Sequence, residues 1–241
     1  MGANCHYTGA GPTIETTLFN RKNMLSRVRY HDFLGNATAN SGIEYVIGET
    51  NSISCQGAFN ISDVMASAVW VVDYTMYLSS LKVSRVHFHM GTRYRYSPWQ
   101  PIYYNETEAH VKPMYYGNLF NAAVFAGGNK QTEVLVNETN FGAYAVYGSG
   151  VLESITAISL NLWNSTFDPL KRPYTALVLP KQWENATVSR LTSPGVDSAD
   201  NITFAGQHVD SNAKIVGKKT LENVVAGKVL VGAGEAVLIK M

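Results

Sequence analysis

Glu49 and His89 are the side chains whose places in the sequence point most directly to chemistry. Glu49 closes a largely apolar run, residues 43–48, and polar residues 50–52 follow it; His89 closes a second run, residues 83–88. A β-branched run that stops at a polar or ionisable residue is typical of a buried parallel strand whose carboxyl end opens into a cleft. Catalytic groups of α/β barrels lie at such strand ends.

The segment between these runs must place the two side chains. Residues 61–81 are long and apolar and follow the cap-competent Asn60, which predicts a helix packed on a sheet. The order strand, helix, strand predicts a βαβ unit. Because such crossovers are right-handed and join parallel strands, we expect Glu49 and His89 on one rim of the sheet.

Composition excludes several classes of protein. The chain has 241 residues, 46% hydrophobic content and a formal net charge of +1, which is ordinary for a globular protein. So weak a charge gives no support to binding of nucleic acid or a membrane surface. Asp63 and Asp73 interrupt the most apolar helix, so no membrane span is predicted.

Sequons indicate a secreted glycoprotein, although the first residues lack the basic and apolar segments of a signal peptide. Roughly three Asn-x-Ser/Thr acceptors are expected by chance, and seven occur. We expect a secreted parent protein of which this chain begins in the middle; accidental sequons in Asn-rich loops are the alternative. The predicted glycan sites are Asn36, Asn60, Asn105, Asn137, Asn164, Asn185 and Asn201.

Two cysteines, Cys5 and Cys55, are too few for a disulfide scaffold and lack the spacing of metal ligands. A bridge between them in an oxidising compartment and two free buried thiols are both compatible with the sequence. No metal or cofactor site is predicted.

The pattern changes near residue 127. A predicted helix over residues 111–125 comes before it, and eight short alternating runs separated by turn residues come after it. Such spacing predicts an antiparallel β-sandwich. The runs are residues 133–136, 143–147, 155–163, 174–179, 186–191, 201–204, 229–231 and 236–239.

Four motifs in order resemble the C-terminal half of fungal β-glucuronidases of glycoside hydrolase family 79. They are residues 48–52 (GETNS), 62–74 (SDVMASAVWVVDY), 86–91 (VHFHMG) and 115–120 (YYGNLF). The resemblance implies an α/β plus all-β chain, in which residues 1–126 are the last βα units of an incomplete (β/α)8 barrel and residues 127–241 an antiparallel β-sandwich domain. A complete barrel takes about 250 residues.

The resemblance also implies that Glu49 is the nucleophile of a retaining glycosidase. Such an enzyme needs a second carboxyl group about 5 to 5.5 Å away to protonate the leaving oxygen. Glu15, Glu44 and Asp63 are the nearby candidates, and capping, strand or helix-start roles explain each of them better. We therefore expect a fragment that has the nucleophile, lacks the acid/base and hydrolyses little alone.

Substrate contacts are implied for Tyr7, Asn51, Gly57, His89 and Tyr96, with Tyr96 reaching a glucuronate carboxylate. A core histidine is the equal alternative for His89, and a buried pair with His6 is nearly as plausible for Tyr7. After Glu49 this chain reads Ser-Cys-Gln-Gly at residues 54–57, where some relatives have a tyrosine and a glycine-rich turn. A different sugar is therefore compatible with the sequence.

The function predicted is hydrolysis of O-glycosyl bonds in a glucuronic-acid-containing glycan or glycoside. The alternative from another class is a non-catalytic carbohydrate-binding or degenerate β-sandwich glycoprotein. Substitution of Glu49 separates the two hypotheses, since only an enzyme loses turnover with it.

Overall fold

The structure, a computed structural model, describes residues 11–104 and 106–241. Its helices are α1 (Arg21–Val28), α2 (His31–Asn40), α3 (Met65–Ser80) and α4 (Pro113–Val124), with short 3-10 turns at Pro169–Lys171 and Lys181–Trp183. The first strands are β1 (Tyr45–Thr50), β2 (Val83–Phe88), β3 (Trp99–Gln100) and β4 (His110–Val111). Later strands are β5 (Lys130–Asn137), β6 (Phe141–Gly148), β7 (Val151–Ser159), β8 (Tyr174–Val178), β9 (Thr187–Thr192), β10 (Thr203–Phe204), β11 (His208–Val209), β12 (Ile215–Val216), β13 (Glu222–Asn223), β14 (Lys228–Gly232) and β15 (Ala236–Lys240).

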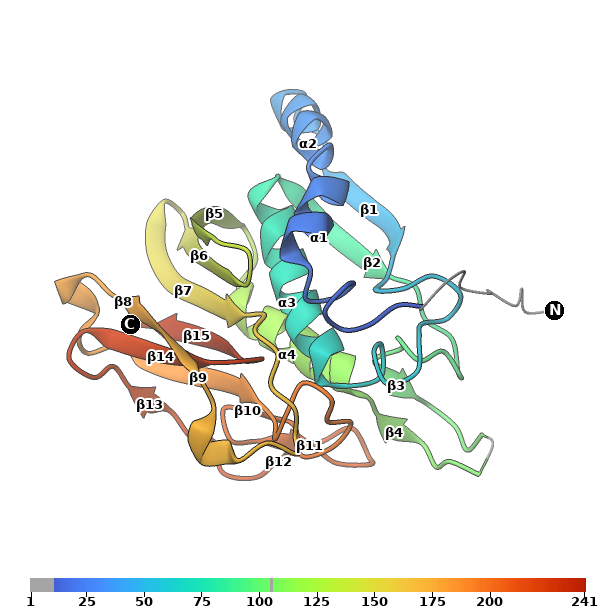
Figure 1. The fold of residues 1–241 in the computed structure, drawn as a ribbon. Helices are drawn as coiled ribbons and strands as arrows, with labels where there is room; N and C mark the ends of the chain where they lie inside the picture. The colour runs from blue at the N-terminus through green and yellow to red at the C-terminus, as the bar shows by residue number, and fades with distance from the viewer. Residues whose placement is uncertain (1–10, 105) are drawn as a thin grey trace.

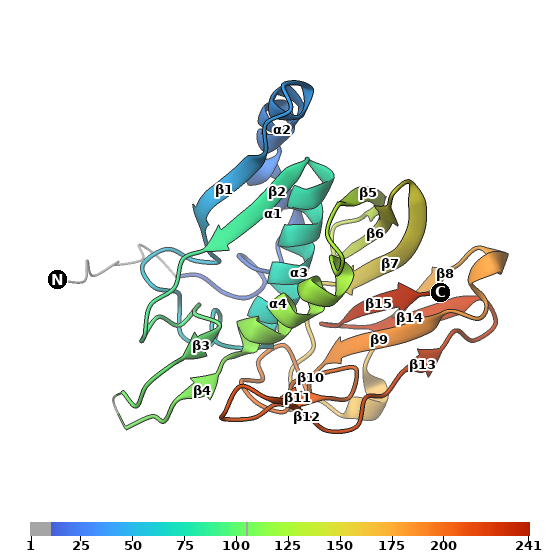
Figure 2. The same cartoon turned by 180° about the vertical axis from the view of Figure 1, so that it is seen from behind.

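Strands β1 and β2 pair in parallel, with Tyr45 opposite Val83 and Thr50 opposite Phe88. The predicted parallel pairing is thereby confirmed. Helix α3 connects the two strands and lies between them and the large sheet (Figure 1). Figure 2 shows both arrowheads pointing toward the side of the molecule where the hairpin β3–β4 projects.

Helix α3 begins at Met65, four residues later than the start predicted at residue 61. Val64 at its N-cap is extended and gives no side-chain cap. The first N–H groups are satisfied from far along the chain instead, because Met65 N donates to Ser198 O at 2.8 Å and Ala66 N to Val196 O at 2.9 Å. Orphan N–H groups at a helix start need such partners.

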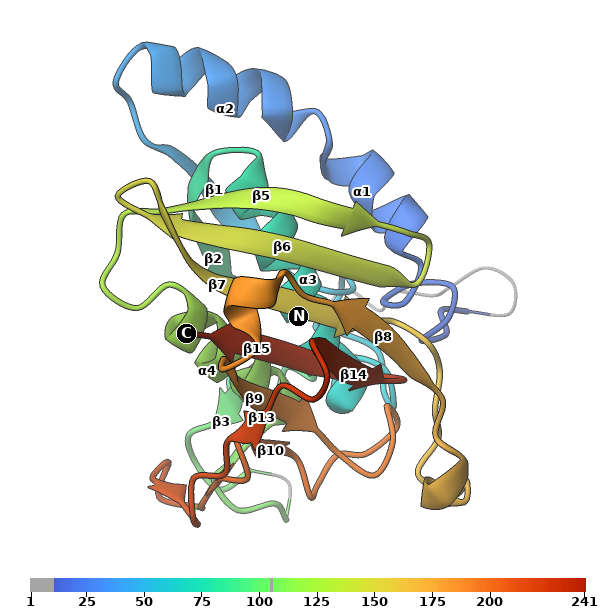
Figure 3. The same ribbon diagram turned by 90° about the vertical axis from the view of Figure 1, so that its left-hand side faces the viewer.

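The later strands form a sandwich of unequal sheets. The larger sheet has the order β10-β9-β15-β7-β6-β5, with β13 added beside β9, and β8 and β14 form a separate antiparallel pair. Figure 3 shows strands β5, β6, β7, β15 and β9 one below another. A cluster of buried residues, including Ala157, Val188, Val231 and Trp183, fills the space between the two sheets. All eight predicted strand-like runs overlap strands of this region.

Strand β15 shows why the large sheet is buried on both faces. Val237 and Ile239 lie in the cluster shared with β8 and β14, whereas Ala236 and Leu238 lie in the cluster shared with the helices. Alternate residues of a strand point to opposite faces. The helical layer packs on the second face, and one core therefore extends across the predicted boundary at residue 127.

A buried ion pair joins the helical layer to the large sheet. The Arg21 Nε donates to Asp73 Oδ2 at 2.9 Å, and both side chains are at most 1% exposed. Tyr144 of β6 donates its hydroxyl to Asp73 at 2.6 Å and accepts from Arg21 at 2.9 Å. Arg21 also donates to the Asn137 side chain and to the Glu138 carbonyl. Three segments distant in sequence are thus fixed together.

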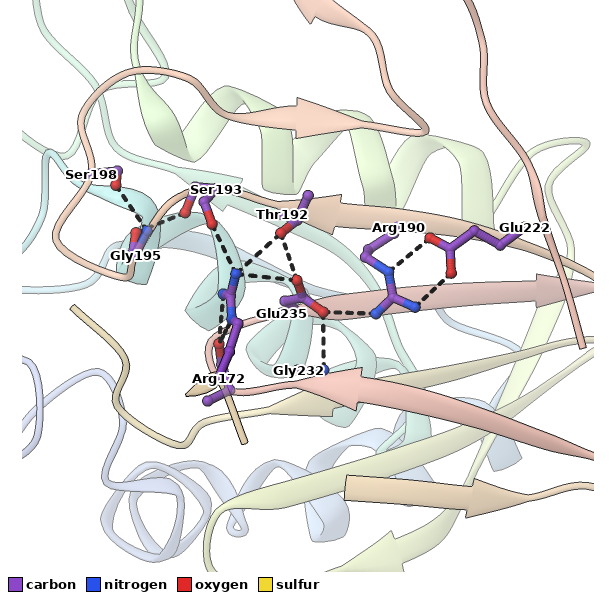
Figure 4. Close-up of polar contacts among 10 residues, drawn as sticks. Arg172, Arg190, Thr192, Ser193, Gly195, Ser198, Glu222, Gly232 and Glu235 are labelled. Carbon is purple, nitrogen blue, oxygen red and sulfur yellow. Dashed lines mark hydrogen bonds and ion pairs between the residues drawn. The ribbon is translucent and has the colours of Figure 1, made fainter. Parts of the chain in front are cut away.

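A second polar network holds the sandwich at the turn before β15 (Figure 4). Glu235, which is 4% exposed, accepts hydrogen bonds from Arg190, Thr192 and the Gly232 N–H at 2.7, 2.6 and 2.9 Å. Arg172 lies 3.3 Å from the same carboxylate and also donates to backbone carbonyls. The buried charge is therefore fully paired, as buried charges must be.

Two further features bear on the sequence predictions. No described helix is both long enough and apolar enough to cross a membrane. Cys55 is disulfide-bonded, which answers the question left open by the sequence for this residue; Cys5, the chain's other cysteine, lies outside the described residues.

Candidate active site at the ends of strands β1 and β2

Glu49 lies one residue before the end of β1, with its side chain exposed. The end of this strand is tied to the residue that follows β2, because His89 N donates to Thr50 O at 2.9 Å. Glu49 and His89 therefore lie on the same rim of the parallel pair, as the crossover argument predicts. The strand ends that carry these two ionisable residues are therefore adjacent at one edge of the fold.

Asn51 fastens the loop that leaves β1. Its Nδ2 donates to the His89 carbonyl at 2.7 Å, and its Oδ1 accepts from the Ser52 N–H at 2.7 Å. Both functional groups of the amide are thus engaged with backbone. The position of Asn51 fixes the loop against the end of β2.

His89 and Tyr96 form the central polar contact of the site. Nδ1 of His89 lies 2.6 Å from the Tyr96 hydroxyl, and the rings meet nearly edge to face at 6.0 Å. Burial raises the pKa of Tyr96, and the neighbouring Tyr94 and the negative charge of Glu49 raise it further. Tyr96 is therefore a neutral hydroxyl near pH 7 and can donate to His89 or to a bound oxygen atom.

Gly57 is enclosed by the site loops. Its φ is +87°, and a Cβ at this position would stand 2.8 Å from Ser62 Cβ and 2.9 Å from Tyr96 N. The preceding residues, Cys55 and Gln56, also have positive φ values of 63° and 74°. Only glycine fits such a backbone beside Tyr96, so Gly57 sets how closely the loop of residues 51–60 approaches that tyrosine.

Comparison with known proteins shows what this chain is similar to. Residues 143–238 match the model of the glycosyl hydrolase family 79 C-terminal beta domain. A β-glucuronidase of Aspergillus niger is 31% identical over 92% of this chain and 44% of its own length. A β-glucuronidase of Neurospora crassa is 33% identical over 66% of this chain and 31% of its own length.

The chain is similar to β-glucuronidases of glycoside hydrolase family 79.

A solved structure shares its fold. The 4-O-α-L-rhamnosyl-β-D-glucuronidase of Fusarium oxysporum 12S, in complex with Rha-GlcA, superposes with a TM-score of 0.79 and 24% identity over 95% of this chain and 51% of that one. The resemblance to the C-terminal part of a fungal family 79 β-glucuronidase is thereby confirmed. The β-glucuronidase-like chain spans less than half the length of the curated relatives it matches.

Sequence reasoning missed one residue of this site in the β-glucuronidase-like chain. Tyr74 of α3 places its hydroxyl 2.9 Å from Thr50 Oγ1, and its ring stacks on Trp70 at 4.8 Å. Tyr74 thus supports the residue next to Glu49. The spacing of Trp70 and Tyr74, one helical turn apart, was the available signal, because residues at i and i+4 share one helix face.

The other carboxylates of the region have partners or surroundings of their own. Glu44 pairs with Arg85 at the exposed surface. Burial raises the pKa of Asp63, and the charges of Arg95 and Lys112 oppose that increase. Glu15 is exposed in the turns before α1.

Two of the predicted site and glycan residues fall outside the part of the chain that the structure describes. Tyr7 lies outside the described residues, as does the sequon at Asn105. Within residues 11–104 and 106–241, no group of three or more His, Cys, Asp or Glu side chains is arranged to hold a metal ion.

Proposed function

We propose that this chain carries the nucleophile, Glu49, of a retaining glycoside hydrolase of the β-glucuronidase type. The observation that carries the proposal is the position of Glu49 at the carboxyl end of β1, where its charge acts on the Tyr96 hydroxyl bound to His89. Carboxylates at such strand ends perform catalysis in α/β barrels. Family 79 relatives named β-glucuronidases support the reaction class.

The role of each residue follows from the chemistry of retention. Glu49 attacks the anomeric carbon to form a glycosyl-enzyme, which water then hydrolyses. The Tyr96 hydroxyl, His89 and the loop closed by Gly57 would orient the sugar beside it. The group that protonates the leaving oxygen would come from barrel units that this chain does not carry, which explains why we expect little hydrolysis by the chain alone.

We also propose that residues 1–126 are the last βα units of a (β/α)8 barrel and residues 127–241 its β-sandwich domain. Among the described residues, β1 and β2 pair only with each other, although parallel sheets are normally larger and covered on both faces. A cavity of about 800 Å³ lies along β2, lined in part by Thr75 and Asn121. The Thr75 hydroxyl and the Asn121 Oδ1 are buried there without hydrogen-bond partners in the described part of the chain.

The outer surface of α2 supports the same proposal. Tyr30, Phe33, Leu34 and Ile43 are exposed on or beside it, with Phe33 77% exposed. Apolar patches of this kind mark surfaces that another element covers. Further βα units would cover both this surface and the free edge of the parallel pair.

A secreted glycoprotein remains our proposal for the parent protein. Six sequon asparagines lie in the described residues. Five of them are exposed, Asn60, Asn137, Asn164, Asn185 and Asn201, and Asn36 is half-buried. None of the six is buried, which supports glycosylation. Mass spectrometry of the protein purified from its natural source would test it.

The decisive experiment is hydrolysis of 4-nitrophenyl β-D-glucuronide by this chain and by the longest product of its gene. We expect little turnover by the chain and ready turnover by a longer product, with Glu49→Gln lowering kcat on the order of 10⁴-fold or more. Glu44→Gln, five residues earlier and paired with Arg85 at the surface, is the matched control and should leave kcat unchanged.

The same assay separates the nucleophile from other roles. If Glu49→Ala activity recovers with added azide and yields the glycosyl azide of inverted configuration, Glu49 is the nucleophile. Azide then takes the place of the missing carboxylate and attacks the face of the sugar opposite the leaving group. Glucuronide binding without turnover, unchanged by Glu49→Gln, would instead favour the non-catalytic carbohydrate-binding protein.

A further inference from the structure

Two arginines of the loop of residues 91–97 each pair with an aromatic ring outside the loop. Arg93 Nη1 donates to the Tyr104 hydroxyl at 3.0 Å, and its guanidinium carbon lies 5.9 Å from the centre of that ring. Arg95 places its guanidinium carbon 5.8 Å from the ring of Phe59. Each arginine thus fixes one aromatic ring at the surface. We call Phe59, Arg95, Arg93, Tyr103 and Tyr104 the arginine–aromatic strip.

The rings of the strip are open to solvent. Phe59 is 68%, Tyr103 60% and Tyr104 40% exposed, and both arginines are exposed as well. Within residues 11–104 and 106–241, neither arginine takes part in an ion pair. Glu106 and Glu108 on the same hairpin do not pair with either guanidinium group, and Asp63, whose charge interacts with that of Arg95, forms no ion pair with it. Both groups can therefore bind an external anion.

The base of the strip is held firmly. Lys112 N donates to Pro98 O at 2.8 Å, and Lys112 Nζ donates to Tyr94 O at 2.9 Å. Gln100 Nε2 donates across the hairpin to Thr107 O at 3.2 Å. These bonds connect the hairpin β3–β4 to the loop of residues 91–97. Rings held on a fixed base lose little conformational freedom when a ligand binds.

The strip begins at the proposed active site. Arg95 N donates to Gln56 O at 2.7 Å, which joins the loop carrying Tyr96 to the turn carrying Gly57. Tyr96 is the next residue and bonds His89. From there the chain continues into the hairpin β3–β4, which projects on the side to which β1 and β2 point (Figure 2). A chain of sugars leaving the site on this side would meet the strip.

The chemistry of the strip selects its ligand. Flat aromatic rings pack on the apolar faces of sugar rings, and a guanidinium group binds a carboxylate through two parallel hydrogen bonds. The outer surface of α2, by contrast, exposes Phe33, Leu34 and Ile43 without such a pairing of arginine and ring. That surface suits a protein neighbour, whereas the strip suits an acidic sugar.

We propose that the arginine–aromatic strip binds an acidic oligosaccharide, with uronate residues of the substrate beyond the one held beside Glu49. This inference rests on the proposed function and extends it from one sugar to a chain. Arg93 and Arg95 bind carboxylates of successive uronates, and Tyr104 and Phe59 pack on the sugar rings. The strip therefore favours uronate-containing polymers over small glucuronides.

Calorimetric titration of the intact chain tests the strip with three probes: hyaluronan tetrasaccharide, D-glucuronic acid and neutral cellotetraose. We expect the tetrasaccharide to bind at least about tenfold more tightly than the other two at low salt, and to weaken at 150 mM salt because exposed charges are screened. Arg93→Gln and Tyr104→Ala should each weaken tetrasaccharide binding by about threefold to tenfold. Binding of glucuronic acid should change less than about twofold.

Matched controls are available at two exposed positions outside the strip, one after helix α1 and one on strand β8. Arg29→Gln at the end of α1 and Tyr174→Ala on β8 alter an exposed arginine and an exposed tyrosine outside the strip. Neither should change any of the three affinities. Thermal unfolding of every variant checks that the exposed substitutions leave the fold intact.

Several results would contradict the proposal that the strip binds an acidic oligosaccharide. One is the absence of tetrasaccharide binding at millimolar concentration. Another is binding of cellotetraose as tightly as the tetrasaccharide. Tetrasaccharide binding that depends on Tyr96 but not on Arg93 or Tyr104 would contradict saccharide binding by the strip and leave the proposed function in place. Failure of Glu49→Gln to reduce glucuronide hydrolysis would remove the proposed function while strip binding persisted. Self-association lost in Arg93→Gln, without saccharide binding, would assign the surface to a second copy.

Discussion

Arg21 and Asp73 are 52 residues apart in sequence and 2.9 Å apart in space, where neither is open to solvent. Their contact joins α1 to α3, and the Tyr144 hydroxyl brings β6 into the same cluster. A Cβ at Gly142 would come within 3.0 Å of both charged side chains, so the sheet approaches them closely. The cluster fixes the helix that also carries Tyr74.

Removing one partner of this pair should destabilise the protein strongly. We expect Asp73→Asn or Arg21→Met to lower the free energy of unfolding by about 3 to 5 kcal/mol, because each leaves an uncompensated buried charge or polar group. The double variant should lose less than the sum. Urea denaturation measures the effect, and Arg85→Met, which breaks an exposed pair with Glu44, should stay within about 1 kcal/mol. Equal losses of stability for the buried pair and the exposed pair would contradict the prediction that burial sets the cost.

Asp63 should make stability depend on pH. Burial raises its pKa in the folded state above 3.8, so the folded protein holds that proton more tightly than the unfolded chain. The associated stability is present below pH 3.8 and is lost as pH rises through the folded pKa. Asp63→Asn avoids that loss, and its stability relative to wild type should therefore increase from pH 3.5 to 7.

Urea midpoints measured across this pH range give the comparison. Glu15→Gln, an exposed carboxylate near the same region, serves as the control. The prediction would be refuted if the difference in stability between Asp63→Asn and wild type stayed constant from pH 3.5 to 7.

Gly57 and Gly48 should respond differently to alanine. Gly57→Ala places a Cβ 2.8 Å from Ser62 Cβ and forces a positive φ, so we expect a loss of about 1 to 3 kcal/mol. A Cβ at Gly48, next to Glu49, would have no atom within 4 Å, and Gly48→Ala should change stability by less than about 0.5 kcal/mol. Thermal denaturation separates them; a tolerated Gly57→Ala would show that the loop beside Tyr96 relaxes.

Glu235 and Glu222 share Arg190 but differ in burial. Glu235→Gln should cost about 3 to 5 kcal/mol, because Arg172 and Arg190 lose the buried carboxylate between them. Glu222, with a side chain 44% exposed, forms its ion pair with Arg190 at the surface, and Glu222→Gln should cost less than about 1 kcal/mol. Guanidinium denaturation would show the difference, and similar losses would mean that exposure does not govern this network.

The sequence predicted the elements that carry local patterns. Two β-branched runs ending at Glu49 and His89 gave the parallel pair, because hydrophobic periodicity and strand ends are local signals. The helix start at Met65 could not be found locally, since its N–H partners come from Val196 and Ser198. Helix α2 was missed, because its sequence is weakly apolar and polar residues interrupt it. The start of a helix was expected shortly after Glu15, and α1 begins at Arg21.

The site could be predicted in part for the same reason. Glu49 and His89 are marked by strand ends, and Tyr96 by its aromatic loop. The contact of Tyr74 with Thr50 and the Arg21–Asp73 pair span more than twenty residues, and in the sequence Asp73 is a charge inside an apolar segment with no visible partner. Contacts of that range follow from tertiary packing, which single-sequence patterns do not encode.

The capping of α3 by the loop at Val196 and Ser198 has a consequence for synthesis. The helix is translated about 130 residues before its cap, so on the order of 10 s pass before those carbonyls emerge from the ribosome. During that interval the start of the helix that positions Tyr74 and Thr50 has no partner from the loop at residues 196–198. We therefore expect the first turn of α3 to reach its final hydrogen bonding only after the β-rich region has been synthesised.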